Sequence, residues 1–263
     1  MPISKHALWA TALASTLALT ACGGSNNESP TVTDQSEPAR DQDTRSFAVD
    51  PASLEFESET GTTTDTWWGV MDNGAGYRVE VPDNWNGVLV MYAHGYRGTG
   101  EDLTVSNPSI RSWLIQNNYA WAASSYSKNY YDVQVGVEDT NELALKFTDI
   151  GKANGRTLVA PHQTFIIGHS MGGHIAAAAV EQETLSSARN KVYYDGSMPM
   201  CGVVGGTYEF DYLLDFTFAA QHVAGLGPDS YPADFDQAAI DSVLWTTTPS
   251  YTAAGVPTSE GLK

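Results

Sequence analysis

A strand, a glycine-flanked serine and a helix follow one another without a break between residues 164 and 180. Residues 164–167 form a short apolar run, residues 168–172 read Gly-His-Ser-Met-Gly, and residues 173–180 continue into an alanine-rich stretch. Because glycine has no Cβ atom, the chain can turn sharply here and the helix can pack close to the strand. This pattern predicts a strand–turn–helix unit with Ser170 at its tip.

Ser170 is therefore a candidate nucleophile. A serine hydroxyl is activated when it is held exposed, where a histidine can take its proton and backbone N–H groups can bind the developing oxyanion. We expect the backbone N–H of Met171, at the start of the helix, to be one of these donors. The alternative is a glycine-rich turn with a purely structural role.

A second glycine motif follows the apolar run at residues 87–93, where residues 94–98 read His-Gly-Tyr-Arg-Gly. Loops that follow parallel strands emerge at the same edge of a sheet, so this loop can reach the oxyanion formed at Ser170. We expect the backbone N–H of Tyr96 to be the second donor. His94 and Gly95 are expected to support the loop, with His94 holding it through hydrogen bonds. The alternative is a plain glycine turn after a strand.

Strand signals alternate with helix signals along the chain. Strands are expected at residues 77–81, 87–93, 119–123 and 164–167, with the first at the edge of the sheet, and helices near residues 110–115, 137–147 and 173–180. This alternation predicts an α/β fold, with a mostly parallel sheet and helices on both of its faces.

Taken together, the loop at residues 94–98, the turn at residues 168–172 and the strands between them resemble the α/β-hydrolase superfamily, over about residues 77–202. Residues 92–98, 121–126 and 194–202 are similar to secreted bacterial α/β hydrolases whose substrates are unassigned. The resemblance implies acyl-enzyme chemistry on an ester, thioester or amide. We expect a serine hydrolase that cleaves a carboxylic ester, in a small molecule or a polymer. A serine peptidase, an acyltransferase and a surface lipoprotein with a vestigial site, which binds a polymer or a partner, are the alternatives.

The general base is harder to place. The superfamily order is nucleophile, acid, histidine, and only two histidines follow Ser170. His174 lies on the nucleophile's own helix, where we expect it to pack or cap. His222 is the candidate base, in an amphipathic stretch at residues 210–224 that predicts a helical lid, within about residues 207–250, after the sixth strand.

No acid is assigned. Asp195 begins its predicted strand and is expected at the end far from the site, while Asp211 and Asp215 are expected on the lid surface. Residues 245–263 contain no convincing buried strand. We therefore expect the chain to be the front part of a longer hydrolase, whose C-terminal strands carry the acid and the histidine.

The N-terminal residues predict export. Residues 1–21 have the charged-then-apolar order of a signal peptide and end in Leu-Thr-Ala before Cys22, which resembles a bacterial lipobox. Lipid on Cys22 would anchor the protein in the cell envelope, at the outer membrane of a Gram-negative cell. The alternative is ordinary cleavage beside an incidental cysteine. Residues 22–45 predict a disordered tether, and residues 46–263 the hydrolase domain.

The composition limits the partners. A net charge of −18 argues against nucleic-acid binding and against electrostatic adhesion to anionic lipid, so the lipid anchor is the one expected membrane contact. No phosphate-binding loop or metal-ligand spacing is present, and no cofactor is expected. Cys201 is expected to be a small buried residue. Nothing in the sequence sets an oligomeric state.

Overall fold

The structure is a computed structural model that describes residues 45–226, 237–250 and 252–262. These residues belong to the unit Arg45–Lys263. The predicted signal peptide, Cys22 and all of the predicted tether except Arg45 lie outside the described residues.

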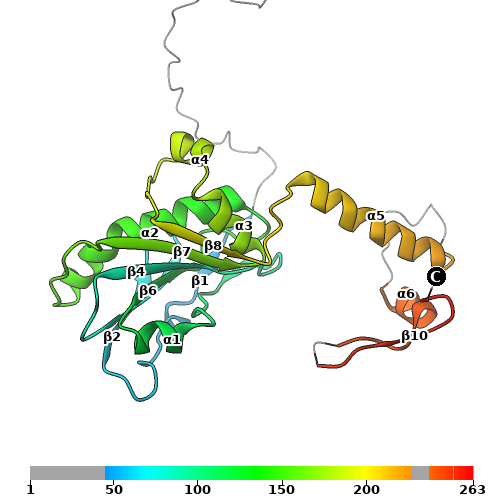
Figure 1. The fold of residues 1–263 in the computed structure, drawn as a ribbon, viewed down its shortest axis with the longest axis horizontal. Helices are drawn as coiled ribbons and strands as arrows, with labels where there is room; N and C mark the ends of the chain where they lie inside the picture. Colours follow the sequence, from blue (N-terminus) through cyan, green and yellow to red (C-terminus); the bar gives the residue numbers. More distant parts are fainter. Residues whose placement is uncertain (1–44, 227–236, 251, 263) are drawn as a thin grey trace, which may run out of the picture. The chain divides into compact units, whose positions relative to one another are not determined.

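Six strands of the described residues form the main sheet, shown in Figure 1. Strands β4, β6, β7 and β8 pair in parallel, while β3 pairs antiparallel with both β2 and β6. The loops that follow the four parallel strands therefore meet at one edge of the sheet. The strands, in spatial order, are β2 (Thr64–Val70), β3 (Gly76–Pro82), β6 (Ala120–Ser124), β4 (Val88–Ala93), β7 (Gln163–His169) and β8 (Gly196–Met200).

Helices pack against both faces of this sheet. Successive side chains of each parallel strand point to opposite faces, so both faces carry apolar side chains to be buried. Helices α2 (Val133–Ala153) and α3 (Met171–Ala178) lie on one face and α1 (Arg111–Gln116) on the other (Figure 1). Along β4, Leu89 and Met91 are buried in the core with α2 and α3, whereas Val90 and Tyr92 are buried with α1. The expected α/β architecture, a mostly parallel sheet with helices on both of its faces, is confirmed.

In the main sheet, one strand was missed and another was misplaced. Residues 77–81 were expected at the sheet edge, but β3 is internal, since β2 pairs along its outer side. The sequence of β2, Thr-Asp-Thr-Trp-Trp-Gly-Val, lacks the alternation that marks a strand. Its neighbouring tryptophans nevertheless separate as in a strand, with Trp67 buried and Trp68 exposed.

Short elements complete the part before β8. Strands β1 (Ala48–Val49) and β5 (Asp102–Leu103) form a parallel pair, and a 3-10 helix (Pro51–Ser53) follows β1. Helix α4 (Gln182–Ser187) lies between α3 and β8.

After β8 the chain forms helix α5 (Thr207–Val223), which contains the predicted lid residues 210–223, and then α6 (Gln237–Leu244). Strands β9 (Trp245–Thr247) and β10 (Val256–Pro257) form a separate antiparallel pair. The helical lid after the sixth strand of the main sheet is thus confirmed as a helix, while its position over the site stays a prediction. Within the described ranges, no helix is both long enough and apolar enough to cross a membrane.

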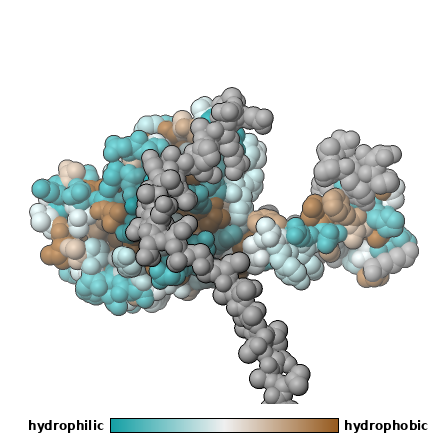
Figure 2. Space-filling view, turned by 90° about the horizontal axis from the view of Figure 1, so that it is seen from above, coloured by the Kyte–Doolittle hydropathy of each residue, from teal (hydrophilic) through white to brown (hydrophobic). Residues whose placement is uncertain are grey.

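Helix α5 exposes much of its hydrophobic surface. Of its residues, only Gln221 is buried. Figure 2 shows hydrophobic residues at the surface of the segment that contains α5. A helix that is hydrophobic on all sides normally lies inside a protein. The exposed hydrophobic residues of α5 are Tyr208, Phe210, Tyr212, Leu213, Leu214 and Phe216.

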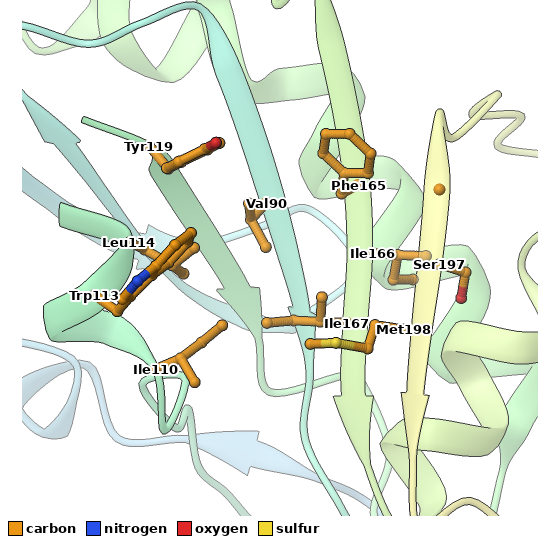
Figure 3. A pocket seen from close by; sticks show the side chains of 11 residues that line it. Val90, Ile110, Trp113, Leu114, Tyr119, Phe165, Ile166, Ile167, Ser197 and Met198 are labelled. Carbon is orange, nitrogen blue, oxygen red and sulfur yellow. The ribbon is translucent and has the colours of Figure 1, made fainter. Parts of the chain in front are cut away.

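The sheet face that carries α1 is open beside that helix. An apolar groove of about 450 Å³ runs there between α1 and the strands. In Figure 3, Trp113 and Leu114 of α1 face Val90, Ile167 and Met198, which come from β4, β7 and β8. Both faces of a parallel sheet are normally covered, so this groove is an unusual exposed apolar surface.

Candidate active site

The residues singled out by sequence lie at the edge of the sheet where the parallel strands end. His94 follows β4, Ser125 follows β6, Ser170 follows β7 and Cys201 follows β8. Ligands of open parallel sheets bind at this edge. Three of the five described non-glycine residues with positive φ are also here: Tyr126, Ser170 and Cys201. Backbone strain of this kind gathers at functional sites.

Ser170 forms the tip of a sharp turn, as the sequence predicts. It is exposed, and its backbone angles are φ 54° and ψ −123°, outside the regions that most residues occupy. The two flanking glycines are required by close packing. A Cβ atom on Gly168 would lie 2.1 Å from the carbonyl oxygen of Gly172, and one on Gly172 would lie 2.0 Å from that of Ala93. The strained turn is therefore held by the end of β4.

The end of β8 holds the turn from the other side. The backbone N–H of Ser170 donates to the carbonyl oxygen of Met200 at 2.9 Å. Behind Ser170, α3 begins at Met171, so the Met171 N–H belongs to the first turn, where backbone N–H groups have no intrahelical partner. An N–H group in this position can bind an anion beside Ser170.

The glycine loop after β4 passes directly over Ser170. A Cβ atom on Gly95 would lie 3.3 Å from Ser170 Cβ, 3.9 Å from Ser170 Oγ and 3.2 Å from the carbonyl oxygen of His169. Tyr96 follows at once, with its side chain 47% exposed. The structure therefore brings Ser170, Met171 and the loop that carries Tyr96 together, as the sequence predicts.

The buried ring of His94 holds this loop through contacts with backbone carbonyl groups and with another aromatic ring. Its ring is buried, with Nδ1 2.6 Å from the carbonyl oxygen of Gly95 and Nε2 3.1 Å from that of Ser125. The ring also stacks on Tyr126, with 4.1 Å between the centroids. Burial lowers the pKa of His94 to about 4, despite the two carbonyl contacts that favour the charged form. A buried, neutral ring in these contacts supports the loop.

Ser125 and Tyr126 lie beside the candidate site, and neither was assigned a role from the sequence. Ser125 Oγ accepts a hydrogen bond from the N–H of Gly76 at 2.9 Å, and the Tyr126 hydroxyl donates to the carbonyl oxygen of His94 at 2.9 Å. Burial raises the pKa of Tyr126 well above its ordinary value, so the hydroxyl stays a donor. The available signal was their place directly after a buried strand.

A neighbouring loop holds the far end of the glycine loop. The N–H of Tyr130 donates to the carbonyl oxygen of Gly98 at 3.0 Å, and the Asn129 side chain donates to that of Gly100 at 2.7 Å. Arg97 donates to the hydroxyl of Ser106. The glycine loop is therefore fixed at both of its ends.

The candidate base, His222, is not joined to the nucleophile. It is an exposed residue near the C-terminal end of α5. Among the described residues, no histidine forms a hydrogen bond with Ser170 Oγ. His174 packs as expected, with its Nδ1 3.2 Å from the Tyr131 hydroxyl. The His169 ring lies against that of Tyr92.

The position of Asp195 is as predicted. It directly precedes β8, at the end of the strand far from Ser170, and its carboxylate accepts a hydrogen bond from the N–H of Thr164 at 2.8 Å. Asp211 and Asp215 are exposed on α5, as expected for lid residues. Within the part of the chain that the structure describes, no acid is paired with a histidine beside Ser170.

The prediction for Cys201 was wrong. Its side chain is exposed, and its φ of 50° makes it part of a turn rather than of the buried strand. The apolar residues around it suggested burial, but β8 ends at Met200 and the chain turns there. A search of the described residues for three or more grouped metal-ligating side chains finds none.

No known protein family and no curated protein matches this sequence. Among solved structures, esterase B from Lactobacillus rhamnosis is 15% identical over 70% of this chain and 63% of that one, with a TM-score of 0.42. Brefeldin A esterase, a bacterial homologue of human hormone-sensitive lipase, is 19% identical over 54% and 42% of the two chains, with a TM-score of 0.33. A fungal esterase from Rhizomucor miehei is 17% identical over 54% and 45%, with a TM-score of 0.36. This chain therefore spans less than two thirds of the length of each of these structures.

Proposed function

We propose that the protein is a serine hydrolase that cleaves carboxylic esters through an acyl-enzyme. One observation carries the proposal: the strained, exposed Ser170 lies against the backbone of the loop at Gly95, with 3.9 Å between Ser170 Oγ and the Cβ position of that glycine. A nucleophile and an oxyanion loop in this relation are what acyl transfer requires.

In the proposed reaction, Ser170 Oγ bonds to the carbonyl carbon of the ester while its proton passes to a general base. The negative oxygen that forms is bound by the N–H groups of Met171 and Tyr96. The carbon–oxygen bond of the ester then breaks, and the alcohol leaves with the proton. Water attacks the acyl-enzyme in the same way, which releases the acid and restores Ser170.

Cleavage of an ester at this site requires less proton transfer to the leaving group than cleavage of an amide. An amide nitrogen must be protonated before it leaves, whereas an activated ester releases a weakly basic alcohol. Among the described residues, no acid is paired with a histidine beside Ser170 and the glycine loop. The names of the similar solved structures, which are esterases, agree with this choice but do not carry it.

His222 remains the candidate base. It lies 15 residues after Thr207 along α5, which is about 22 Å along the helix axis at 1.5 Å per residue. To reach Ser170, α5 must therefore lie across the strand ends as a lid. In that arrangement the His222 ring would take the Ser170 proton and return it to the leaving alcohol.

A fluorophosphonate probe tests the nucleophile separately from its base. Attack by Ser170 forms a phosphorus–oxygen bond and expels fluoride, and intact mass spectrometry detects the adduct. We expect one adduct on the wild-type protein and none on Ser170→Ala. Absence of labelling in the wild type would contradict the proposal and favour a vestigial site.

Turnover identifies the substrate class and the base. We expect hydrolysis of p-nitrophenyl butyrate, and its loss in His222→Ala would identify His222 as the base and contradict a base on further C-terminal strands. Faster turnover of a p-nitroanilide would identify a peptidase, and acyl transfer to an added alcohol that outpaces hydrolysis would identify an acyltransferase. If His222→Ala keeps full activity, the base is another residue.

We also propose that the protein is exported and lipidated on Cys22, since residues 1–21 and the sequence before Cys22 predict a lipoprotein signal. In a bacterial host, an alkyne fatty acid should label the wild-type protein in the membrane fraction. Cys22→Ala should abolish the label and release the protein. Equal labelling of both proteins would exclude this attachment site.

A further inference from the structure

Arg97 lies on the loop that passes over the candidate nucleophile, two residues after Gly95. It is exposed, and the hydrogen bonds at Gly98 and Gly100 fix the backbone that follows it. The guanidinium donates to the hydroxyl of Ser106, which uses only part of its five N–H groups. A rigid backbone therefore presents a cation at the edge where substrate would bind.

Within the part of the chain that the structure describes, no carboxylate neutralises this cation. Four other cations of the described residues pair with carboxylates: Arg111 with Glu80, Lys146 with Glu142, Arg156 with Asp65 and Arg189 with Glu138. Among the described residues, Arg97 forms no ion pair, not even with Glu101 or Asp102, which follow closely in the sequence. Arg78 and Lys191 likewise bond only to uncharged groups among the described residues, but Arg97 lies on the loop that passes over Ser170.

The charge of Arg97 acts on the strand ends beside Ser170. Burial raises the pKa of Tyr92, and the nearby Arg97 charge works against that rise. Burial and, to a smaller degree, Arg97 lower the pKa of His94. Tyr92 is the last residue but one of β4 and His94 is the first residue after it, so the Arg97 charge lies close to the end of the strand that leads into the glycine loop.

We propose that Arg97 binds a carboxylate of the substrate, so that the preferred substrates of Ser170 are esters that also carry a free carboxylate. The inference rests on the proposed esterase function. A guanidinium binds a carboxylate through two parallel N–H···O bonds, which orients the substrate as well as attracting it. A protein with a net charge of −18 repels anions at long range, so a local cation would favour the binding of an anionic ester.

Two methyl esters of equal chain length test the proposal: monomethyl adipate, which ends in a carboxylate, and methyl hexanoate, which ends in a methyl group. Proton release at constant pH gives kcat/KM for each, and the ratio of the two values is the readout. We expect Arg97→Gln to lower this ratio about tenfold. Arg97→Lys, which keeps the charge but not the fork, should lower it about threefold.

Lys152→Gln is the matched control. Lys152 is an exposed cation in the last turn of α2, and its replacement removes the same charge elsewhere on the protein. We expect the ratio to stay within about twofold of the wild-type value. Raising the salt from 0.05 M to 0.5 M should lower the ratio for the wild type but not for Arg97→Gln, because salt screens an exposed charge pair.

Failure of the Arg97 inference can be distinguished from failure of the proposed esterase function. Suppose that both esters are hydrolysed and that Arg97→Gln leaves the ratio unchanged, which includes equal slowing of the hydrolysis of both. Arg97 then does not bind the carboxylate, and the inference is wrong. If neither ester is hydrolysed and the fluorophosphonate does not label Ser170, the proposed function itself fails.

Discussion

The strand ends around Ser170 and helix α5 carry the candidate nucleophile and the candidate base, but the protein fixes the two regions very differently. At the strand ends, Gly95, Gly168 and Gly172 leave no room for a methyl group without displacement of neighbouring atoms, and the His94 ring is buried. Along α5, the one buried residue is Gln221, and Phe216 is 68% exposed. The glycine loop and the turn at Ser170, which we propose bind the oxyanion, are thus built into the core, whereas the helix that carries the candidate base is not.

This difference teaches which part of the chemistry the fold specifies. The turn at Ser170 and the glycine loop are held by backbone packing between β4, β7, β8 and α3, so both form when the sheet forms. A base on a helix with little buried surface depends on how that helix is covered. Substitutions in the two regions should therefore differ sharply, and the four predictions below run from the largest expected effect to the smallest.

The largest effect is expected from Gly172→Ala. The added Cβ would lie 2.0 Å from the carbonyl oxygen of Ala93, a backbone atom that cannot move without shifting β4. We expect the free energy of unfolding, measured by urea titration, to fall by about 3 kcal/mol or more. Gly100→Ala is the control, because nothing lies within 4 Å of its Cβ position. A loss under about 1 kcal/mol for Gly172→Ala would show that the elbow is not rigid.

The second effect concerns pH. The pKa of His94 is lowered from 6.5 to about 4 by burial, so the unfolded chain binds a proton on this ring at a higher pH than the folded protein. Its contribution to stability is therefore present above about pH 6.5 and is lost as the pH falls to about 4. The total loss is about 3 kcal/mol.

Urea unfolding at several pH values checks this prediction. His94→Asn keeps a polar side chain without the titration, so its stability should fall less steeply between pH 6.5 and 4 than that of the wild type. Parallel curves for the two proteins would mean that His94 is not buried in its neutral form.

The third effect separates activity from stability. In Gly95→Ala, the added Cβ meets Ser170 Cβ at 3.3 Å and the carbonyl oxygen of His169 at 3.2 Å, so the loop must move by a few tenths of an ångström. We expect kcat/KM for p-nitrophenyl butyrate to fall about 30-fold, because the Tyr96 N–H is displaced from the oxyanion. The unfolding free energy should change by less than about 1 kcal/mol. Unchanged activity would place the oxyanion donors elsewhere.

The smallest effect is expected on α5. Phe216 and Phe147 are both helical phenylalanines, but Phe147 is fully buried against the sheet. Phe216→Ala should change the unfolding free energy by less than about 0.5 kcal/mol, whereas Phe147→Ala should lower it by about 3 to 5 kcal/mol. Comparable losses for the two variants would show that α5 is covered in solution and would remove the contrast between the regions.

Much of the site could be predicted from the sequence, because local patterns determine it. The elbow at Ser170 and the loop at residues 94–98 each combine a buried strand with glycines at close approaches, and both signals lie within a few residues. The helix at α5 was likewise visible in its apolar spacing. These are short-range properties of the chain.

The missed features depend on contacts between distant residues. Strand β2 has no alternation and is a strand because β3 pairs with it. Tyr126 joins the site because its ring stacks on His94, 32 residues away in sequence. Cys201 was expected to be buried, but the end of β8 and the turn that exposes the thiol are fixed by packing against the elbow. No local pattern contains this information.

Cys201 is a position at which a fluorescent label can be attached close to Ser170. Among the described residues it is the one cysteine, its thiol is exposed, and the carbonyl group just before it accepts the hydrogen bond of Ser170 N–H. A maleimide dye on this thiol would sit at the same sheet edge as the nucleophile. Its fluorescence would report the arrival of an ester, or the approach of α5, without any change to the reacting groups.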